Sequence, residues 1–397
     1  MAKRRILIAG VIVSSLLSMT GRETQAAEWS ADPSISVKGE YNSNLTLSRL
    51  PGEVWGHWVS PSVRFAGSTE RLEVSGKAAG DFVNYYGDQD RSLTNVSFPV
   101  TAKYAREDDM FSLDSAFTRD NTLRTELQQT GVVLGFTQRN QWSTNPSWRR
   151  SLTDRFSVQL GYQYANTSYE DGRQFGLFDY DVHGGNVGLS YKLTERDSAQ
   201  LTGSYSRVDL PVSGLQIVTP SALLSMTHAV SEATTFTVSG GPKWVEQTLT
   251  SGSMALSDHR LIWSFGSSVR TKWMDGQAGL EANRDVNVSG LGILVRTDRL
   301  GASISKELTE TVTMSLAGQV FFVETVPVRS AGLQATKTRF ISATPAATWR
   351  LNDWWSLEAS YTYADRRTDV SNGTDASGGH STFLKLTYVI PKLSVAR

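Results

Sequence analysis

The chain has no cysteine, and this absence removes several classes of protein at once. Without thiols there is no disulfide framework, no cysteine-based metal site or nucleophile, and no lipoprotein acylation site. The chain also lacks an excess of either charge, because 39 basic residues balance 39 acidic ones. No basic stripe appears, so nucleic acid is not an expected partner.

Long hydrophobic runs are missing too, except near the start. Basic residues at positions 3–5 precede an apolar run from Ile6 to Leu17, and a polar stretch follows. Roughly twelve apolar residues fall short of the ~20 that a membrane-spanning helix needs. The pattern therefore predicts a secretory signal peptide, residues 1–26, cleaved after Ala26 or one residue later, with a membrane anchor as the alternative.

The remaining chain, residues 27–397, shows no linker, low-complexity tract or shift in composition, so we expect one domain. Apolar residues make up 39% of the sequence, which is little for a single water-soluble core of this length. A membrane barrel would account for this value, because only its outer face must be apolar while its lumen stays wet.

A short polar tetrad recurs along the chain at intervals of 35 to 43 residues, measured between second positions. Strict alternation of apolar and polar residues follows each copy, which over ten or more residues is typical of a transmembrane β-strand. The tetrads are Leu152–Arg155, Leu193–Arg196, Val230–Ala233, Trp273–Gly276, Leu308–Thr311 and Leu351–Trp354, with weaker copies at Ser68–Arg71 and Arg106–Asp109.

Eight short turns join sixteen strands in pairs, and one further strand lies at each end, near Ile35 and Leu384. The sequence thus predicts an all-β fold, a transmembrane antiparallel up-and-down β-barrel of about 18 strands (16–20). Its short turns would be periplasmic and its longer loops extracellular, and an even strand number returns both termini to the periplasm.

Two residue types mark depth along these strands. Several tryptophans lie close to the short turns, where an interfacial girdle would need them. They are Trp148, Trp273, Trp349, Trp354 and Trp355.

Four prolines lie inside expected strands, each seven or eight residues before a short turn. They are Pro61, Pro99, Pro146 and Pro345. This spacing predicts a repeated bulge or kink near one depth.

The inward faces of the strands are the expected place of function. Both signs of charge occur there in similar numbers, so no strong preference for small anions or cations is implied. Arg260, Arg270 and Lys272 lie on one strand and could form a local site for an anionic ligand. The predicted channel-lining residues are Arg64, Glu73, Lys77, Asp81, Lys103, Asp114, Arg149, Arg260, Arg270, Lys272, Glu281, Glu358 and Lys385.

Catalytic, metal and cofactor motifs are not found. The five histidines stand apart, with no two at metal-ligand spacing, and no nucleophile elbow or phosphate-binding loop occurs. We therefore expect no enzyme, no metal and no cofactor. The one catalytic combination worth testing is His183 with Ser190 or Ser204, as in an outer-membrane lipid hydrolase.

Acidic residues of one loop region offer a weaker alternative. Glu170, Asp171, Asp179 and Asp181 could bind calcium that bridges lipopolysaccharide. A solvated loop is the expected state of these four residues.

Two segments resemble a known family. Tyr41-Asn42-Ser43-Asn44-Leu45 resembles the Tyr-x-x-Asn-aliphatic opening of β-barrel porins found with exosortase and exopolysaccharide systems in Gram-negative bacteria. Arg119 to Leu127, ahead of Gly131, looks like that family's loop between early strands. The resemblance implies an outer-membrane barrel for polysaccharide or solute passage, without catalytic residues. Family members often end in an aromatic residue, whereas here Tyr388 is the last one.

The expected function is that of an outer-membrane channel for passive or facilitated passage of polar solutes, saccharides among them. Its expected surroundings are outer-membrane lipid, lipopolysaccharide and the barrel-assembly machinery; the oligomeric state stays open. The alternatives are a non-conducting component of exopolysaccharide export or surface assembly, the lipid hydrolase, and a soluble secreted β-protein such as a lectin.

Overall fold

The computed structural model describes residues 28–88, 90–122, 136–328, 336–370, 373–391 and 393–396. The predicted signal peptide lies outside the described residues, and so does most of the second segment that carries the family resemblance. None of the helices in the described ranges is long and apolar enough to cross a membrane.

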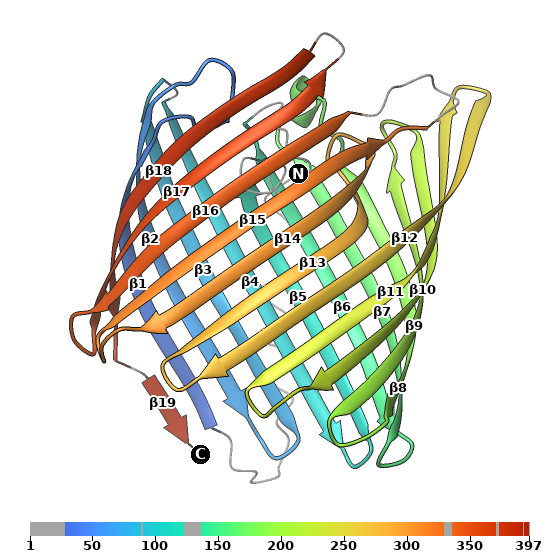
Figure 1. Cartoon of the computed structure of the whole chain (residues 1–397), viewed down its shortest axis with the longest axis horizontal. Coiled ribbons are helices and arrows are strands. Elements are labelled where there is room, and N and C mark those ends of the chain that lie inside the picture. Colours follow the sequence, from blue (N-terminus) through green and yellow to red (C-terminus); the bar gives the residue numbers. More distant parts are fainter. Residues whose placement is uncertain are drawn as a thin grey trace.

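The described chain forms a closed antiparallel barrel of eighteen strands, which confirms the predicted fold and strand number (Figure 1). Each strand pairs with the next in sequence, and β18 pairs with β1 to close the sheet. The strands are β1 Glu28–Asn42, β2 Val54–Ser68, β3 Leu72–Gly87, β4 Arg91–Arg106, β5 Asp109–Asn121, β6 Gln138–Ser151, β7 Phe156–Tyr169, β8 Tyr180–Lys192, β9 Asp197–Leu210, β10 Leu215–Ala229, β11 Thr234–Ser251, β12 Met254–Trp273, β13 Gly276–Val288, β14 Leu294–Glu307, β15 Val312–Val326, β16 Lys337–Arg350, β17 Trp355–Val370 and β18 Gly373–Val389. A short strand, β19 (Leu393–Ala396), pairs with the start of β1.

All eight short turns lie where the tetrads predict them, at one end of the barrel. Their polar second residue explains the motif. The Thr194 hydroxyl accepts hydrogen bonds from the backbone N–H groups of Arg196 and Asp197, at 3.1 and 3.0 Å. Equivalent bonds to Thr153, Ser231, Thr309 and Asn352 hold four other turns. Hydroxyl and amide side chains stabilise tight turns in this way, so the tetrad encodes the reversal locally.

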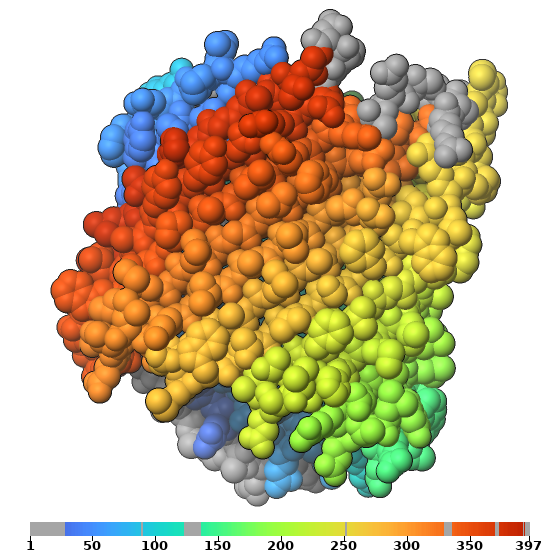
Figure 2. Space-filling view, viewed as in Figure 1, coloured from blue at the N-terminus to red at the C-terminus, as the bar shows by residue number. Residues whose placement is uncertain are grey.

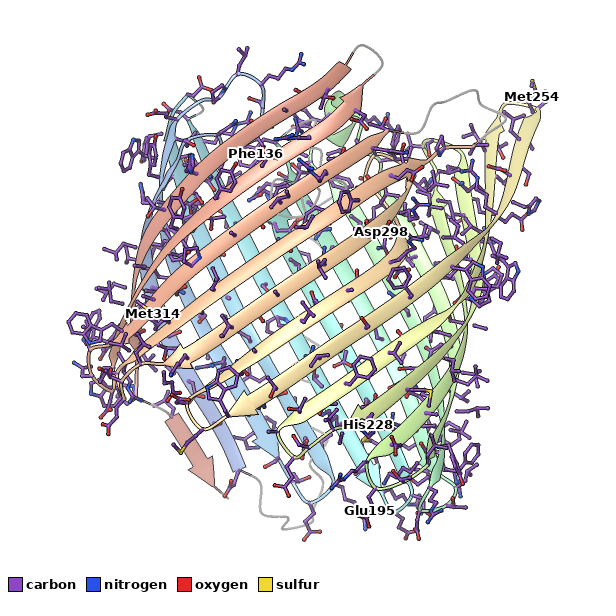
Figure 3. The ribbon with its side chains drawn as sticks, viewed as in Figure 1. Phe136, Glu195, His228, Met254, Asp298 and Met314 are labelled. Carbon is purple, nitrogen blue, oxygen red and sulfur yellow. The ribbon has the colours of Figure 1, made fainter. Side chains whose placement is uncertain are left out.

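The two faces of the sheet differ as the alternation predicts. Leu160 and Val187 are register partners on β7 and β8, and their side chains are 43% and 50% exposed on the outer face. Their neighbours on the other face are small or polar. Figure 3 locates the two ends, with Glu195 in a short turn and Met254 at the tip of a hairpin at the opposite end. We refer to these as the short-turn end and the long-loop end.

The prolines do not form the predicted bulges. Beside Pro61 the β2–β3 ladder skips two residue pairs, yet the register of Val59 with Phe82 is kept by Ser62 with Ala79. Pairing gaps with unchanged register also occur at the other three prolines. No residue is inserted, so the prediction of a bulge is wrong, while the kink, the other form of the prediction, stays a prediction. Proline lacks the N–H that the ladder needs, and a local gap accommodates this loss.

Candidate functional site

The pairing register places every predicted lining residue on the inner face of the barrel. Some of them meet there. Glu358 and Lys385 are register partners and form an ion pair of 2.9 Å, and Arg64 lies opposite Lys77. That these residues line a route for solute stays a prediction.

The predicted anionic site is not assembled. Arg260 stands ten residues from Arg270 on β12, which is about 33 Å along an extended strand. Its guanidinium is engaged near the long-loop end, where it pairs with Asp258 at 2.7 Å and donates to the carbonyl of Pro327. Arg270 and Lys272 remain together near the short-turn end.

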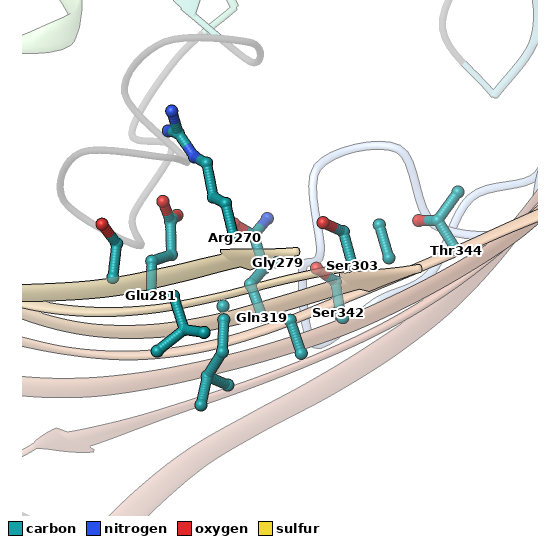
Figure 4. A pocket seen from close by; sticks show the side chains of 14 residues that line it. Arg270, Gly279, Glu281, Ser303, Gln319, Ser342 and Thr344 are labelled. Carbon is teal, nitrogen blue, oxygen red and sulfur yellow. The ribbon is translucent and has the colours of Figure 1, made fainter. Parts of the chain in front are cut away.

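A shallow recess opens in the inner wall of β12 to β16, with a volume of about 350 Å³. Figure 4 shows Arg270 and Glu281 projecting from this wall into the lumen, with Gln319 nearby. Gly279 and Gly301 leave space in the recess because they have no side chain. A Cβ at Gly301 would lie 3.1 Å from the Glu281 side chain. The recess therefore combines two charged groups with a floor of small residues.

The loop between β1 and β2 folds into the lumen. Leu47, at a left-handed φ of 47°, is only 3% exposed and belongs to one buried cluster with Val295, Phe321 and Phe340 of the inner wall. The Asn44 side-chain amide donates to the carbonyls of Ser48 and Gly378, at 2.9 and 3.1 Å, and so fixes the loop. Asn44 is the asparagine of the Tyr-x-x-Asn-aliphatic segment.

A second constriction joins the β7–β8 and β13–β14 connections. The first contains a short 3₁₀ helix, η2 (Gly172–Phe175). The backbone N–H of Phe178 donates to the carbonyl of Gly290 in the other connection, at 2.8 Å. Leu177 lies beneath them in a buried cluster that also includes Leu210 and Ile217. Two segments more than a hundred residues apart thus meet inside the barrel.

A third apolar group lies against β2 and β3. Phe136, just before β6, is 6% exposed and packs with Trp58 and Tyr85. The Arg91 guanidinium donates to the Phe136 carbonyl at 2.7 Å and lies 4.8 Å from the centre of its ring. Three apolar clusters therefore lie inside the barrel toward the long-loop end, next to ion pairs such as Arg260 with Asp258.

The inner face of β7 to β10 is almost free of charge. Lys192, next to a short turn, is the one ionisable group that the alternation directs inward on these fully described strands, apart from the tyrosines near the long-loop end. Hydroxyl and amide side chains fill the rest of the polar region. We call this region the neutral sector; its polar residues are Ser157, Gln159, Gln163, Thr167, Asn186, Ser190, Ser198, Gln200, Thr202, Ser204, Ser206, Thr219, Ser221, Ser225 and Thr227.

The hydrolase constellation does not form. His183 pairs with Tyr164 on the outer face, and its Nδ1 lies 2.8 Å from the Tyr162 hydroxyl. Ser190 and Ser204 point to the inner face, so the wall separates them from the imidazole. All the histidines take outward register positions, namely His57, His183, His228, His259 and His380.

The four loop carboxylates do not converge on a calcium site. Glu170 pairs with Arg119 at 2.8 Å. Asp179 accepts the Tyr169 N–H at 2.8 Å, and Asp181 accepts the Asn166 amide at 2.8 Å. Within the described ranges no group of three or more histidine or acidic side chains could hold a metal ion.

No family model and no curated protein matches the chain. Solved structures resemble it at low identity. OpdQ of Pseudomonas aeruginosa shares 12% identity at a TM-score of 0.45, over 91% of this chain and 99% of that one. OccAB4 of Acinetobacter baumannii shares 10% at 0.44, over 92% and 99%. The outer membrane protein OprD of P. aeruginosa shares 10% at 0.43, over 92% and 94%.

Proposed function

We propose that this chain is an outer-membrane channel through which neutral polar solutes, saccharides among them, pass by diffusion. The observation that carries the proposal is the neutral sector, a continuous strip of hydroxyl and amide groups on the inner face of four adjacent strands. The exposed apolar outer face supports insertion in a bilayer, because the described strands close into a barrel in which only the upper part of β12 lacks a neighbouring strand on one side.

The chemistry of the strip suits a polyol. A sugar hydroxyl both donates and accepts hydrogen bonds, and so do the serine, threonine, asparagine and glutamine side chains. Ser204 and Ser221 already exchange a hydrogen bond of 2.6 Å across adjacent strands. A solute hydroxyl can exchange with such partners at little net cost, since each bond contributes only ~1 kcal/mol. Weak contacts at several successive positions permit both entry and release.

Passage in this scheme is passive and needs no catalytic group. The loop constrictions set the size limit, and the neutral sector holds the solute briefly below them. Outer-membrane lipid and lipopolysaccharide would surround the apolar face, and the barrel-assembly machinery would insert the chain. An association with exopolysaccharide systems belongs to the same proposal, because a polymer of neutral sugars would meet the same strip.

The test is conductance of the refolded mature chain in a planar bilayer, with neutral oligosaccharides of increasing length. Steady current with brief, length-dependent interruptions is expected. Fractionation of the producing cells should place the chain with the outer membrane. A soluble chain would contradict the proposal, and so would a bilayer-inserted barrel whose current ignores saccharide.

A second candidate is a non-conducting component of polymer export or surface assembly. The buried contact between the β7–β8 and β13–β14 connections favours it, because these segments meet inside the lumen. A folded, inserted barrel that carries no current would support this candidate and exclude the channel.

A further inference from the structure

Strand β12 extends further toward the long-loop end than its pairing with β13 does. It runs from Met254 to Trp273 but pairs with β13 only from Phe265 to Trp273. Among the described residues, 254–264 pair with β11 alone, so no described strand lies along their other backbone edge. The β11–β12 hairpin rises separately at the long-loop end (Figures 1 and 2, yellow). An open sheet edge is unstable against lipid, so a long edge of this kind calls for a partner.

The upper part of β13 lies inside β10 to β12 rather than beside them. By alternation Val286 shares the outer face of Leu280, which is 52% exposed. Val286 is nevertheless 9% exposed and belongs to the same buried cluster as Ile217 and Val245, which point inward from β10 and β11. Val326, at the end of β15, is buried in that cluster too. The sheet therefore overlaps itself at this seam.

Side chains hold the overlapped part in place. The Lys243 ammonium of β11 lies 2.5 Å from the Asp285 carboxylate of β13, across a strand that separates them in the sheet order. The Ser264 hydroxyl also donates to Asp285, at 3.3 Å. Gln247 donates to the carbonyl of Val326, at 3.3 Å. On the side facing β11 and β12 these contacts form a latch made of a few polar bonds and an apolar cluster, without a backbone ladder. On its other side the segment stays paired with residues 294–297 of β14, so this part of β14 must move with it.

The same segment fits a second position. If β13 kept its register along β12, residues 285–288 would face residues 261–264. Val286 and Val288 would then join the exposed Trp263 on the outer face, and the two polar residues of the segment would face the lumen. This is the alternation that a wall strand requires. We propose that residues 285–297, the paired upper ends of β13 and β14 with the connection between them, form a flap with two positions, the latched seat and a zipped seat in which residues 285–288 pair with residues 261–264 of β12.

The zipped seat would change the aperture of the barrel. The flap tip at Gly290 holds the β7–β8 connection through the Phe178 N–H, so moving the tip outward breaks that constriction. The latched seat gains buried apolar contacts, and the zipped seat gains backbone hydrogen bonds. Two packed arrangements of this kind interconvert as discrete states rather than by continuous deformation. The inference goes beyond the proposed function, since it assigns a mobile element and its docking edge.

A chain without cysteine permits a direct test by disulfide trapping. Trp263→Cys with Val286→Cys pairs two positions that become direct partners only in the zipped seat. Val269→Cys with Leu280→Cys is the matched control, because these residues are already register partners on the same strands. Both variants are refolded in lipid vesicles, oxidised, and examined by non-reducing electrophoresis and peptide mass spectrometry.

The control pair is expected to cross-link fully. The test pair should cross-link more slowly, and several-fold faster when Asp285→Asn removes the latch. Asp209→Asn, which breaks an ion pair of the outer face, should leave its rate unchanged. The proposal is overturned if the test pair stays reduced in both backgrounds while the control pair closes. Dimers linked through position 263 would also overturn it, by assigning the edge to a second copy.

Conductance adds an independent readout. Oxidation of the test pair should raise the single-channel current, and a reductant should restore it. An unchanged current despite complete cross-linking would contradict the effect on aperture. The cross-linking rates require only a folded barrel, so a chain that never conducts would refute the channel without deciding the flap.

Discussion

Strands β7 to β10 and strands β2 to β6 build neighbouring parts of one wall with the same pleat and period, yet their inner faces carry different chemistry. The first group forms the neutral sector. The second, which we call the charged sector, directs both acidic and basic side chains inward, among them Lys77, Asp81 and Asp114. The fold demands only that the inner face be polar, so the choice between hydroxyl and charge is free to serve selectivity.

The two sectors also differ in how they are held together. The charged sector contains a buried ion pair, in which the Arg139 guanidinium donates two hydrogen bonds to Asp120, at 3.0 and 2.9 Å. The neutral sector is held by hydroxyl contacts such as Ser204 with Ser221, and at its border Gln159 accepts a hydrogen bond from Arg149 of β6. Removing one member of a buried pair leaves a charge without compensation, whereas a lost hydroxyl contact costs little.

The largest effect should therefore follow from Asp120→Ala. We expect it to lower the free energy of unfolding by about 3–5 kcal/mol, because Arg139, with 6% of its side chain exposed, loses its counter-charge. Ser204→Ala should cost under ~1.5 kcal/mol. Urea unfolding in lipid vesicles, followed by tryptophan fluorescence, measures both. Equal losses would remove the energetic distinction between the sectors.

A charge placed in the neutral sector should have the next largest effect. Ser204→Asp replaces a hydroxyl, which can donate a hydrogen bond to a sugar, by a carboxylate, which can only accept one. The carboxylate also binds water more strongly than the hydroxyl does. Losing about 1.4 kcal/mol of contact shortens the residence of a neutral oligosaccharide roughly tenfold. Current-interruption times report this residence. Ser204→Thr, which keeps the hydroxyl, is the control and should change them little.

A turn of the neutral sector ranks third. Thr194→Val removes the acceptor for two backbone N–H groups in the turn that joins β8 and β9. The expected loss is ~1 kcal/mol in the free energy of unfolding, without change in ion selectivity. Thr309→Val in the equivalent β14–β15 turn should behave alike. If either variant changed the residence time of the saccharide, the turns at the short-turn end would influence solute binding in the sectors.

The smallest effect on saccharides should come from the charged sector. Lys77→Gln removes one inward cation that faces Arg64 across the β2–β3 ladder. Reversal potentials in a salt gradient should shift toward cation preference at low salt and return at about 1 M salt, where charges are screened within ~3 Å. Saccharide residence should change less than about twofold, since 0.4 kcal/mol corresponds to that factor. A larger change would place the saccharide on the charged sector.

The barrel itself was predictable because its signals are local. The turn around Thr194 is fixed by hydrogen bonds within three residues, and the alternation of Leu160 with its neighbours fixes the face. The proline bulge was wrongly predicted, since spacing alone does not distinguish an inserted residue from a skipped hydrogen bond at Pro61. The faces of the lining residues followed from the same period of two.

The inward loops were not predictable, because their contacts join distant parts of the chain. Leu47 is buried against Phe321, and Phe178 bonds to Gly290; no local pattern encodes these pairs. Asn44 was singled out as part of a motif, but its bond to Gly378 of the neighbouring strand β18, distant in sequence, gives the reason. In the sequence, the neutral sector corresponds to inward positions between Ser157 and Ala229 that carry a single charged residue, Lys192, and a search for charged residues passes over such a stretch.

The most direct test is single-channel recording of refolded residues 27–397 with neutral linear oligosaccharides, compared with the Ser204→Asp and Lys77→Gln variants. Steady current is expected, with interruptions that shorten in Ser204→Asp and persist in Lys77→Gln. A folded barrel without current would contradict the channel itself. Interruptions that shorten only in Lys77→Gln would contradict the role assigned to the neutral sector.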